Sequence, residues 1–275
     1  MHRELEFPDL LRLIEERADA FRAVVADAPR LDAEVPTCPG WTLLDLVRHV
    51  GEGRRTWGAT VAAGPADARA AGPAPADSPT AEWERPAVAA WLAASTRQLV
   101  GALREAGPDR GCWTWWGTSQ SPRTAGGVAR HQLQEIALHT YDARIAVGAR
   151  PSLPRDVALD GVEEFLFTCC ATTVAWPHDP AVVDFHAAEG RSWRLRLSAE
   201  GARAERLPVD RAAAPDATAP DAAESYAAAP DAADVAARGT AAELVLTFYG
   251  RTPLDALALD GDHEILDRLA EWEPE

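Results

Sequence analysis

The sequence predicts a mainly α-helical protein, in which a four-helix bundle over residues 1–150 precedes a small α+β domain over residues 151–275. Three observations predict this class. Apolar residues recur at a helical period through the first half of the chain, and alternation with a period of two appears only after it. Stretches rich in Pro, Ala and Gly separate these segments. The length of 275 residues suits one large domain or two of ordinary size.

Four amphipathic segments are expected to form the bundle. They span about residues 8–28, 43–63, 82–106 and 121–150. Thr42 and Asp45 resemble a capping box at the start of the second segment, with Asp in place of Glu. Ser121 and Pro122 form a suitable N-cap and first residue for the fourth segment.

The second domain should mix helices and strands. One helix is expected from about Arg155 to Val174, and two more in TAAELVLTFYGR and DHEILDRLAEW. AVVDFHA and SWRLRLSA alternate as strands do. The low-complexity stretch of Ala, Pro and Asp over residues 212–234 is expected to hold a weak strand or a loop.

Composition excludes several classes of function. The formal net charge of −16 opposes binding to phosphate backbones, so no nucleic-acid partner is expected. No segment is apolar for long enough to span a membrane or to act as a signal peptide. The four Cys lack the C-x-x-C spacing of zinc or redox sites, which favours reduced thiols in a cytoplasmic protein. Such a bundle is expected to be a monomer or a homodimer.

The stretch QEIALHTYDA carries the candidate chemistry. Glu135 and His139 are four residues apart, so on a helix both side chains point from one face. Imidazole and carboxylate groups both bind zinc, and His49, at the border of the apolar stripe of the second helix, is the best candidate for a third ligand. Three protein ligands would leave one position of the metal open.

A simpler interpretation stays open at this point. The pattern E-x-x-x-H arises by chance in many helices as a solvated or hydrogen-bonded pair. His131 lies four residues before Glu135 on the same stripe and competes with His49 as a ligand. A lone His on a helix is more often a surface or core residue than a ligand.

Two segments, CPGWTLLDLVRHVGEGRRTW and ARHQLQEIALHTYDARIAVG, together resemble the mycothiol-dependent maleylpyruvate isomerase family, whose N-terminal domain is a DinB-like bundle. The matching residues, in order, are Trp41, His49, Glu135, His139, Asp142 and Ala143. VAARGTAAELVLTFYGR followed by LDGDHEILDRLAEW resembles the small sterol-carrier-like domain that follows the bundle in this family. The resemblance therefore covers nearly the whole chain.

The resemblance implies a divalent metal, most often zinc, held by His49, Glu135 and His139. It also implies that the open position takes the sulfur of mycothiol, the low-molecular-weight thiol of actinobacteria. The thiolate would then attack a small electrophilic substrate, in an isomerisation or in a transfer. Two alternatives stay open. One is a DinB-like hydrolase in which the metal activates a water molecule. The other is a non-catalytic bundle that binds a small molecule, and His131 as a fourth metal ligand would indicate this alternative.

Two further residues have candidate roles beside the metal. Asp142 could hydrogen-bond the second ring nitrogen of a ligand His, or form a surface salt bridge with Arg144 or Arg48. Arg251, in FYGR, matches an Arg that the family places near its active site, where it could bind a substrate carboxylate. It could equally be a helix-terminal Arg that complements the helix dipole.

The sequence departs from the family in two places. Thr140 and Tyr141 follow His139, where Arg-Trp is frequent. The segment CWTWWGTSQ is unusually aromatic. Its three Trp, at positions 113, 115 and 116, either line an apolar pocket or anchor the loop to the core. A lining role predicts a larger and more aromatic substrate than a small dicarboxylic acid.

Overall fold

A computed structural model describes residues 5–72, 78–149, 151–208 and 232–274, and its chain forms two compact units. The first unit, here called the bundle, comprises residues 1–117 and 121–164, and the second, the sheet unit, comprises residues 118–120 and 165–275. Each unit is described by itself.

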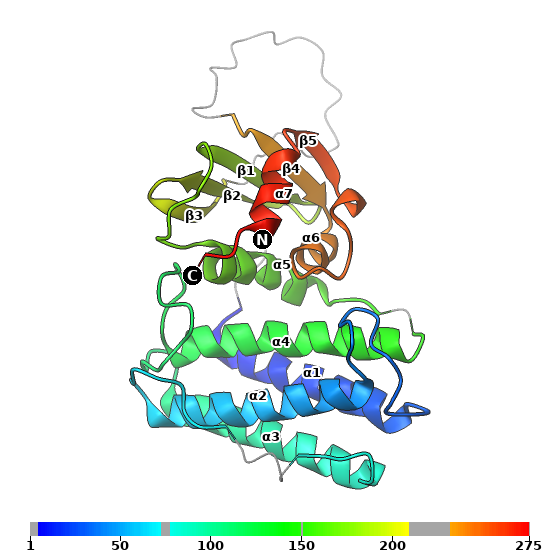
Figure 1. Ribbon diagram of the computed structural model, residues 1–275. Coiled ribbons are helices and arrows are strands. Elements are labelled where there is room, and N and C mark those ends of the chain that lie inside the picture. Colours follow the sequence, from blue (N-terminus) through cyan, green and yellow to red (C-terminus); the bar gives the residue numbers. More distant parts are fainter. Residues whose placement is uncertain (1–4, 73–77, 150, 209–231, 275) are drawn as a thin grey trace, which may run out of the picture. The chain divides into compact units, whose positions relative to one another are not determined.

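Five helices make up the bundle: α1 (Phe7–Asp27), α2 (Leu43–Ala63), α3 (Arg85–Ala106), α4 (Ala125–Ala146) and α5 (Arg155–Glu164). The first four run alongside one another, with α1 and α2 each packed against α3 and α4 (Figure 1). The predicted four-helix bundle is therefore confirmed. Helix α5 packs against α4, so this compact unit extends into the range 151–275.

Helix α2 begins where the sequence predicts and packs closely against α3. The hydroxyl of Thr42 accepts a hydrogen bond from the Asp45 amide at 3.3 Å, and the Asp45 carboxylate accepts one from the Thr42 amide at 3.0 Å. A Cβ atom at Gly51 would lie 1.8 Å from the ring of Trp91. Glycine at this position therefore lets the indole of α3 rest directly on the backbone of α2.

The start of α4 differs from the prediction. The helix begins at Ala125 with Thr124 as its N-cap, and not at Ser121 and Pro122. The carbonyl oxygen of Pro122 accepts a hydrogen bond from the indole N–H of Trp116 at 3.3 Å, so Pro122 belongs to the loop before the helix. Helix α3 likewise begins at Arg85, three residues after the expected Glu82.

The single helix expected from Arg155 to Val174 is wrong in its second half. Helix α5 ends at Glu164, and a π-helix, η2 (Phe165–Cys170), follows in the sheet unit. The backbone of Thr172 then exchanges two hydrogen bonds with Ala202, at 3.0 and 2.9 Å. At Thr172 the backbone therefore pairs with Ala202 of β3 and no longer forms helical hydrogen bonds.

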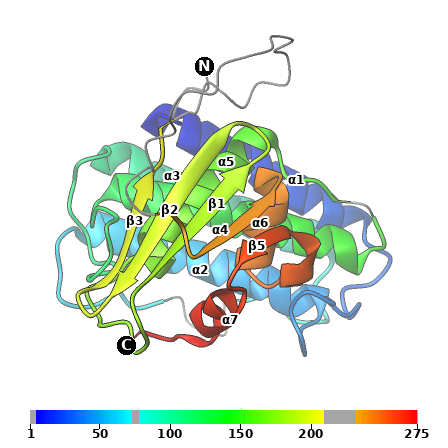
Figure 2. The same cartoon turned by 90° about the horizontal axis from the view of Figure 1, so that it is seen from above.

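The sheet unit contains one five-stranded sheet in the order β3-β2-β1-β4-β5 (Figure 2). Its strands are β1 (Ala181–Ala187), β2 (Arg191–Ser198), β3 (Gly201–Arg206), β4 (Val235–Gly239) and β5 (Ala258–Gly261). β1 and β4 are parallel, and the other neighbouring pairs are antiparallel. Helices α6 (Ala241–Phe248) and α7 (Glu264–Glu271) and the short 3-10 helix η4 (Leu254–Ala256) complete the unit, with α6 and α7 packed against β1.

The predicted α+β character is confirmed, with β1 and β2 at the expected places. β3, β4 and β5 are not predicted from the sequence, because GARAER, VAARG and ALDG are short and contain few of the β-branched and aromatic residues typical of strands. The low-complexity stretch 212–234 lies mostly outside the described residues. None of the described helices is both long and apolar enough to cross a membrane.

Candidate metal centre

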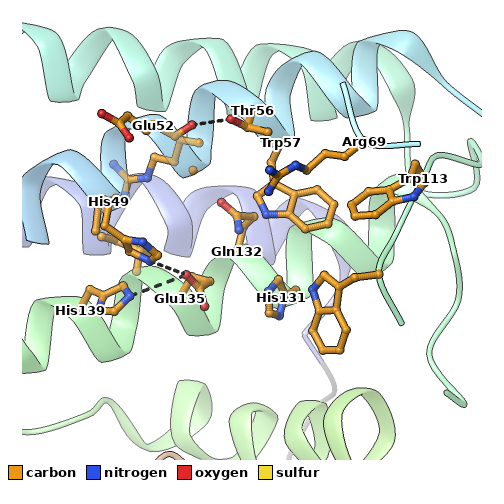
Figure 3. A pocket seen from close by; sticks show the side chains of 15 residues that line it. His49, Glu52, Thr56, Trp57, Arg69, Trp113, His131, Gln132, Glu135 and His139 are labelled. Carbon is orange, nitrogen blue, oxygen red and sulfur yellow. Dashed lines mark hydrogen bonds and ion pairs between the residues drawn. The ribbon is translucent and has the colours of Figure 1, made fainter. Parts of the chain in front are cut away.

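Three side chains from two distant segments of the sequence meet where two helices of the bundle pack against each other (Figure 3). His49 comes from α2, while Glu135 and His139 lie one turn apart on α4. The Oε2 atom of Glu135 is 3.6 Å from Nε2 of His49 and 3.7 Å from Nε2 of His139. The three potential ligand atoms all lie within 4.8 Å of one another.

Local packing positions this triad. The spacing of four residues places Glu135 and His139 on one face of α4, and α2 is the neighbouring helix that this face meets. The indole of Trp41, just before α2, lies with its ring centre 5.0 Å from that of His49. The two imidazoles approach edge to face, with their ring centres 4.9 Å apart.

The distances fit the ligand set of one ion better than a hydrogen-bonded pair. N–H···O hydrogen bonds span about 2.7–3.2 Å, which is shorter than both His–Glu separations. Ligands bound tetrahedrally at about 2.0–2.1 Å from zinc lie about 3.3–3.4 Å apart. Two imidazole nitrogens and a carboxylate also form a donor set that zinc accepts. The residues present therefore fit a divalent cation.

Asp142 fixes the orientation of His139. Its side chain is fully buried, and its Oδ2 atom lies 2.9 Å from Nδ1 of His139. A proton held on Nδ1 leaves the lone pair of Nε2 directed at Glu135 and His49. The thiol of Cys38 donates to the same carboxylate oxygen at 3.5 Å. Asp142 therefore contacts the imidazole of His139, and its role beside a metal ion stays a prediction.

Glu135 is ionised in this setting. Burial works against its negative charge, but the surrounding imidazoles, His49 first among them, lower the pKa of Glu135 to about 2. The carboxylate therefore offers a full negative charge to a cation throughout the physiological pH range.

A pocket of about 450 Å³ opens beside the triad. Its lining includes all three triad residues, together with an aromatic wall of Trp57, Trp113 and Trp115. Figure 3 labels the first two of these indoles. The sequence left two roles open for the Trp residues of this loop, lining a pocket or anchoring the loop to the core, and the structure shows both. Trp113 and Trp115 line the pocket, whereas Trp116 is buried in the core of the bundle.

His131 also lines the pocket, but it lies outside the triad. Its Nδ1 atom is 3.0 Å from the buried carboxylate of Glu164 on α5. Burial alone would lower the pKa of His131, but the hydrogen bond and charge of Glu164 raise it more. The structure thus brings His49, and not His131, together with Glu135 and His139.

Arg251 belongs to the sheet unit, where the end of α6 sets its position. Gly250 has a φ of +69°, and the Arg251 amide donates to the carbonyl oxygen of Leu246 at 2.7 Å, as in a Schellman motif. The guanidinium donates to the carbonyl oxygen of Tyr249, also at 2.7 Å. Its role at the metal centre stays a prediction.

The residues of the pocket wall that sequence reasoning missed include Arg54, Trp57 and Arg69. Arg54 carried a usable signal. It follows Val50 by four residues and precedes Val61 by seven, which places a charged side chain on the buried stripe of α2. Arg69 lies in the loop after α2, where periodicity gives no information.

Comparisons with known proteins agree with this architecture. Residues 11–144 match the model of the mycothiol maleylpyruvate isomerase N-terminal domain, and residues 156–268 match that of the MDMPI C-terminal domain. Two solved structures, of the mycothiol-dependent maleylpyruvate isomerase and of a point mutant of it, align with a TM-score of 0.58. Each alignment has 14% identity and covers 93% of both chains, so it reports the fold. No curated protein matches this sequence. From its two domain matches, the chain belongs to the mycothiol maleylpyruvate isomerase family.

Proposed function

We propose that this protein is a metal-dependent enzyme that uses the thiol of mycothiol as a nucleophile toward a small electrophile, in an isomerisation or a transfer. The observation that carries the proposal is the convergence of His49, Glu135 and His139 at the edge of a pocket of about 450 Å³. Membership of the family supports mycothiol as the thiol.

In this proposal His49, Glu135 and His139 hold the cation, and Asp142 keeps the proton of His139 on Nδ1. A divalent cation bound here would lower the pKa of a thiol, ordinarily about 8.5, so that the thiolate predominates at neutral pH. The protein itself supplies the orientation of the ligands and a partly enclosed space in which the nucleophile meets the substrate.

The aromatic wall of the pocket indicates which kind of substrate the pocket accepts. Trp57 lies with its ring centre 6.0 Å from that of Trp113, at an interplanar angle of 34°. Such side chains favour a ligand with a planar apolar part, because rings and conjugated groups stack on indole faces. We therefore propose a planar, conjugated electrophile. Addition of a thiolate to a conjugated double bond permits rotation before the thiolate leaves, whereas retention of the new C–S bond gives a transfer product.

Metal analysis tests the site. Wild-type protein should bind about one zinc ion per chain, and His49→Ala and His139→Ala should each lose it. His263→Ala is the matched control, because His263 is exposed at the start of α7 and belongs to no such cluster in the described chain. Full metal content in both triad variants would refute the ligand assignment.

Dependence on mycothiol tests the reaction. Zinc-loaded protein is incubated with conjugated electrophiles, with and without mycothiol, and isomers and adducts are separated by chromatography and mass. The proposal expects products only with mycothiol. Turnover without any thiol would instead indicate a hydrolase that uses a metal-activated water. Ligand binding without turnover under either condition would indicate the non-catalytic alternative.

A further inference from the structure

His131 lies in the wall of the pocket, on α4 and one turn before Glu135 (Figure 3). Its Nδ1 atom is 3.0 Å from the carboxylate of Glu164 on α5, and the Glu164 side chain is only 1% exposed. In the described chain, Nε2 of His131 has no hydrogen-bond partner and is not fully buried, and 10% of the side chain is exposed. One ring nitrogen is thus held by the protein, and the other is open to a ligand in the pocket.

Three indole rings lie next to this imidazole. The ring centres of Trp57, Trp115 and Trp116 are 6.0, 5.7 and 5.3 Å from that of His131. Close packing of this kind restricts the rotation of the imidazole and excludes most of the water around it. Indole rings also attract a cation at such distances. The setting therefore accepts the protonated form of His131 as well as the neutral form.

His131 and His139 are held in the same way. Nδ1 of His139 lies 2.9 Å from the buried carboxylate of Asp142, which matches the 3.0 Å between His131 and its own carboxylate. A carboxylate at Nδ1 keeps a proton on this atom and leaves Nε2 for chemistry. Nε2 of His139 belongs to the triad, whereas His131 belongs to no group of three possible metal ligands in the described chain. A second oriented imidazole in the pocket therefore points to a role other than metal binding.

Addition of a thiolate to a double bond requires a proton donor. The sulfur supplies the electron pair of the new C–S bond, and the electron pair of the double bond moves onto the substrate. In a pocket walled by indoles this negative charge is costly unless a proton neutralises it. Among the described residues that line the pocket, His131 is the one imidazole outside the triad. Imidazole suits the task because its ordinary pKa lies close to neutral pH.

We propose that His131 is the catalytic acid and base of this pocket, and that Glu164 is its positioning residue. This inference rests on the proposed function and adds the group that moves the proton. As an imidazolium, His131 donates its Nε2 proton to the substrate atom that receives the electron pair, and a neutral imidazole with its proton on Nδ1 remains. In an isomerisation, Nε2 removes this proton after rotation, the double bond forms again and the thiolate leaves. In a transfer, the proton stays with the product, and His131 regains one from water.

The charged groups around His131 favour its protonated form. Burial alone would lower the pKa of His131, but the hydrogen bond and charge of Glu164, and then the charge of Glu135, raise it. Because Glu164 contributes more than Glu135, a cation held by the triad would not remove the main cause of this increase. The other charged side chains that line the pocket come from α2 and from the loop after it: Glu52, Arg54 and Arg69.

Two probes that differ in their need for a proton test the proposal. Zinc-loaded protein and mycothiol receive either benzylideneacetone, a conjugated ketone whose adduct requires a proton, or chlorodinitrobenzene, which loses chloride and takes up none. His131→Gln should lower kcat for the ketone roughly 100- to 10,000-fold, and should leave both its KM and the reaction of chlorodinitrobenzene unchanged. His263→Gln is the matched control, because His263 is exposed at the start of α7, and it should behave as wild type with both probes.

Glu164→Gln separates positioning from a purely structural role. Without the carboxylate the pKa of His131 falls, so kcat for the ketone should begin to decline at a lower pH than in wild type, because less imidazolium remains. Glu163→Gln is the matched control, because Glu163 is the neighbouring buried carboxylate of α5 and accepts a hydrogen bond from Arg130 at 3.0 Å. The control should leave the pH profile unchanged. An NMR titration of protein with labelled histidine checks the fall in the pKa of His131 without any turnover.

Two outcomes would overturn the inference. One is an unchanged kcat for the ketone in His131→Gln. The other is an equal loss of both reactions in His131→Gln together with an unchanged pH profile in Glu164→Gln, which would assign the pair a structural role. Failure of wild type to turn over either probe with mycothiol would instead count against the proposed function, and the catalytic role of His131 would fall with it. The NMR titration would still report whether Glu164 controls the protonation of His131.

Discussion

Replacement of Asp142 by Asn tests how the ligands of the proposed metal site are oriented. The carboxylate is fully buried and lies 2.9 Å from Nδ1 of His139. Asn keeps the volume but removes the charge, and its amide can present an N–H to Nδ1 and so favour the wrong tautomer. Loss of such an orienting partner weakens metal binding about 10- to 100-fold, which corresponds to about 1.4–2.7 kcal/mol.

Competition with a chromophoric zinc chelator measures this change directly. Asp45→Asn is the matched control, because it also neutralises an Asp of the bundle but acts at the N-terminus of α2. The control should lower the melting temperature and leave zinc affinity unchanged. If Asp142→Asn binds zinc as tightly as wild type, the carboxylate does not orient His139, and the reasoning from the 2.9 Å contact is refuted.

Three further changes test the bundle. Glu164 raises the pKa of His131 in the folded protein above its value of about 6.5 in the unfolded chain. The pairing therefore stabilises the fold fully below about pH 6.5, and this contribution is lost as the pH rises through the pKa of His131 in the folded protein. Glu164→Gln should therefore lower the melting temperature more at about pH 5 than at pH 8. Gly51→Ala should destabilise by about 1–3 kcal/mol in denaturant titrations, because its Cβ would meet Trp91 at 1.8 Å. Thr42→Ala should cost about 1 kcal/mol in the same assay through loss of the capping box.

The elements that the sequence predicted well are those with local signals. Thr42 and Asp45 fix the start of α2 through hydrogen bonds between residues three apart, so the signal is complete in the sequence. The strands β1 and β2 alternate because one face is buried. The end of α5 depends instead on pairing of Thr172 with Ala202, thirty residues later, which no local pattern reports.

The residues of the candidate site likewise differ in whether a local sequence signal predicts them. The spacing of Glu135 and His139 follows from helix geometry alone, but the choice between His49 and His131 depends on which helices are neighbours. The structure groups His49, and not His131, with Glu135 and His139, and the carboxylate of Glu164 on α5 lies 3.0 Å from Nδ1 of His131. In the sequence, the position of His49 at the border of the apolar stripe of the second helix made it the best candidate, and the resemblance to a family agreed with it. The contact of Arg54 with the hydroxyl of Thr96 on α3 could be found only from the packing of the two helices.

Helix α4 explains why the site resists prediction. It packs against α1 as well as against α2 and α5, and polar residues are buried on more than one of its faces. Gln134 donates to the Asp160 carboxylate of α5 at 3.0 Å, and the adjacent Glu135 faces the pocket. The polar contacts to α5 act together with the packing against α1 and α2 to hold α4 in the rotation that directs Glu135 and His139 toward His49. A change at Asp160 should therefore weaken zinc binding without touching a ligand.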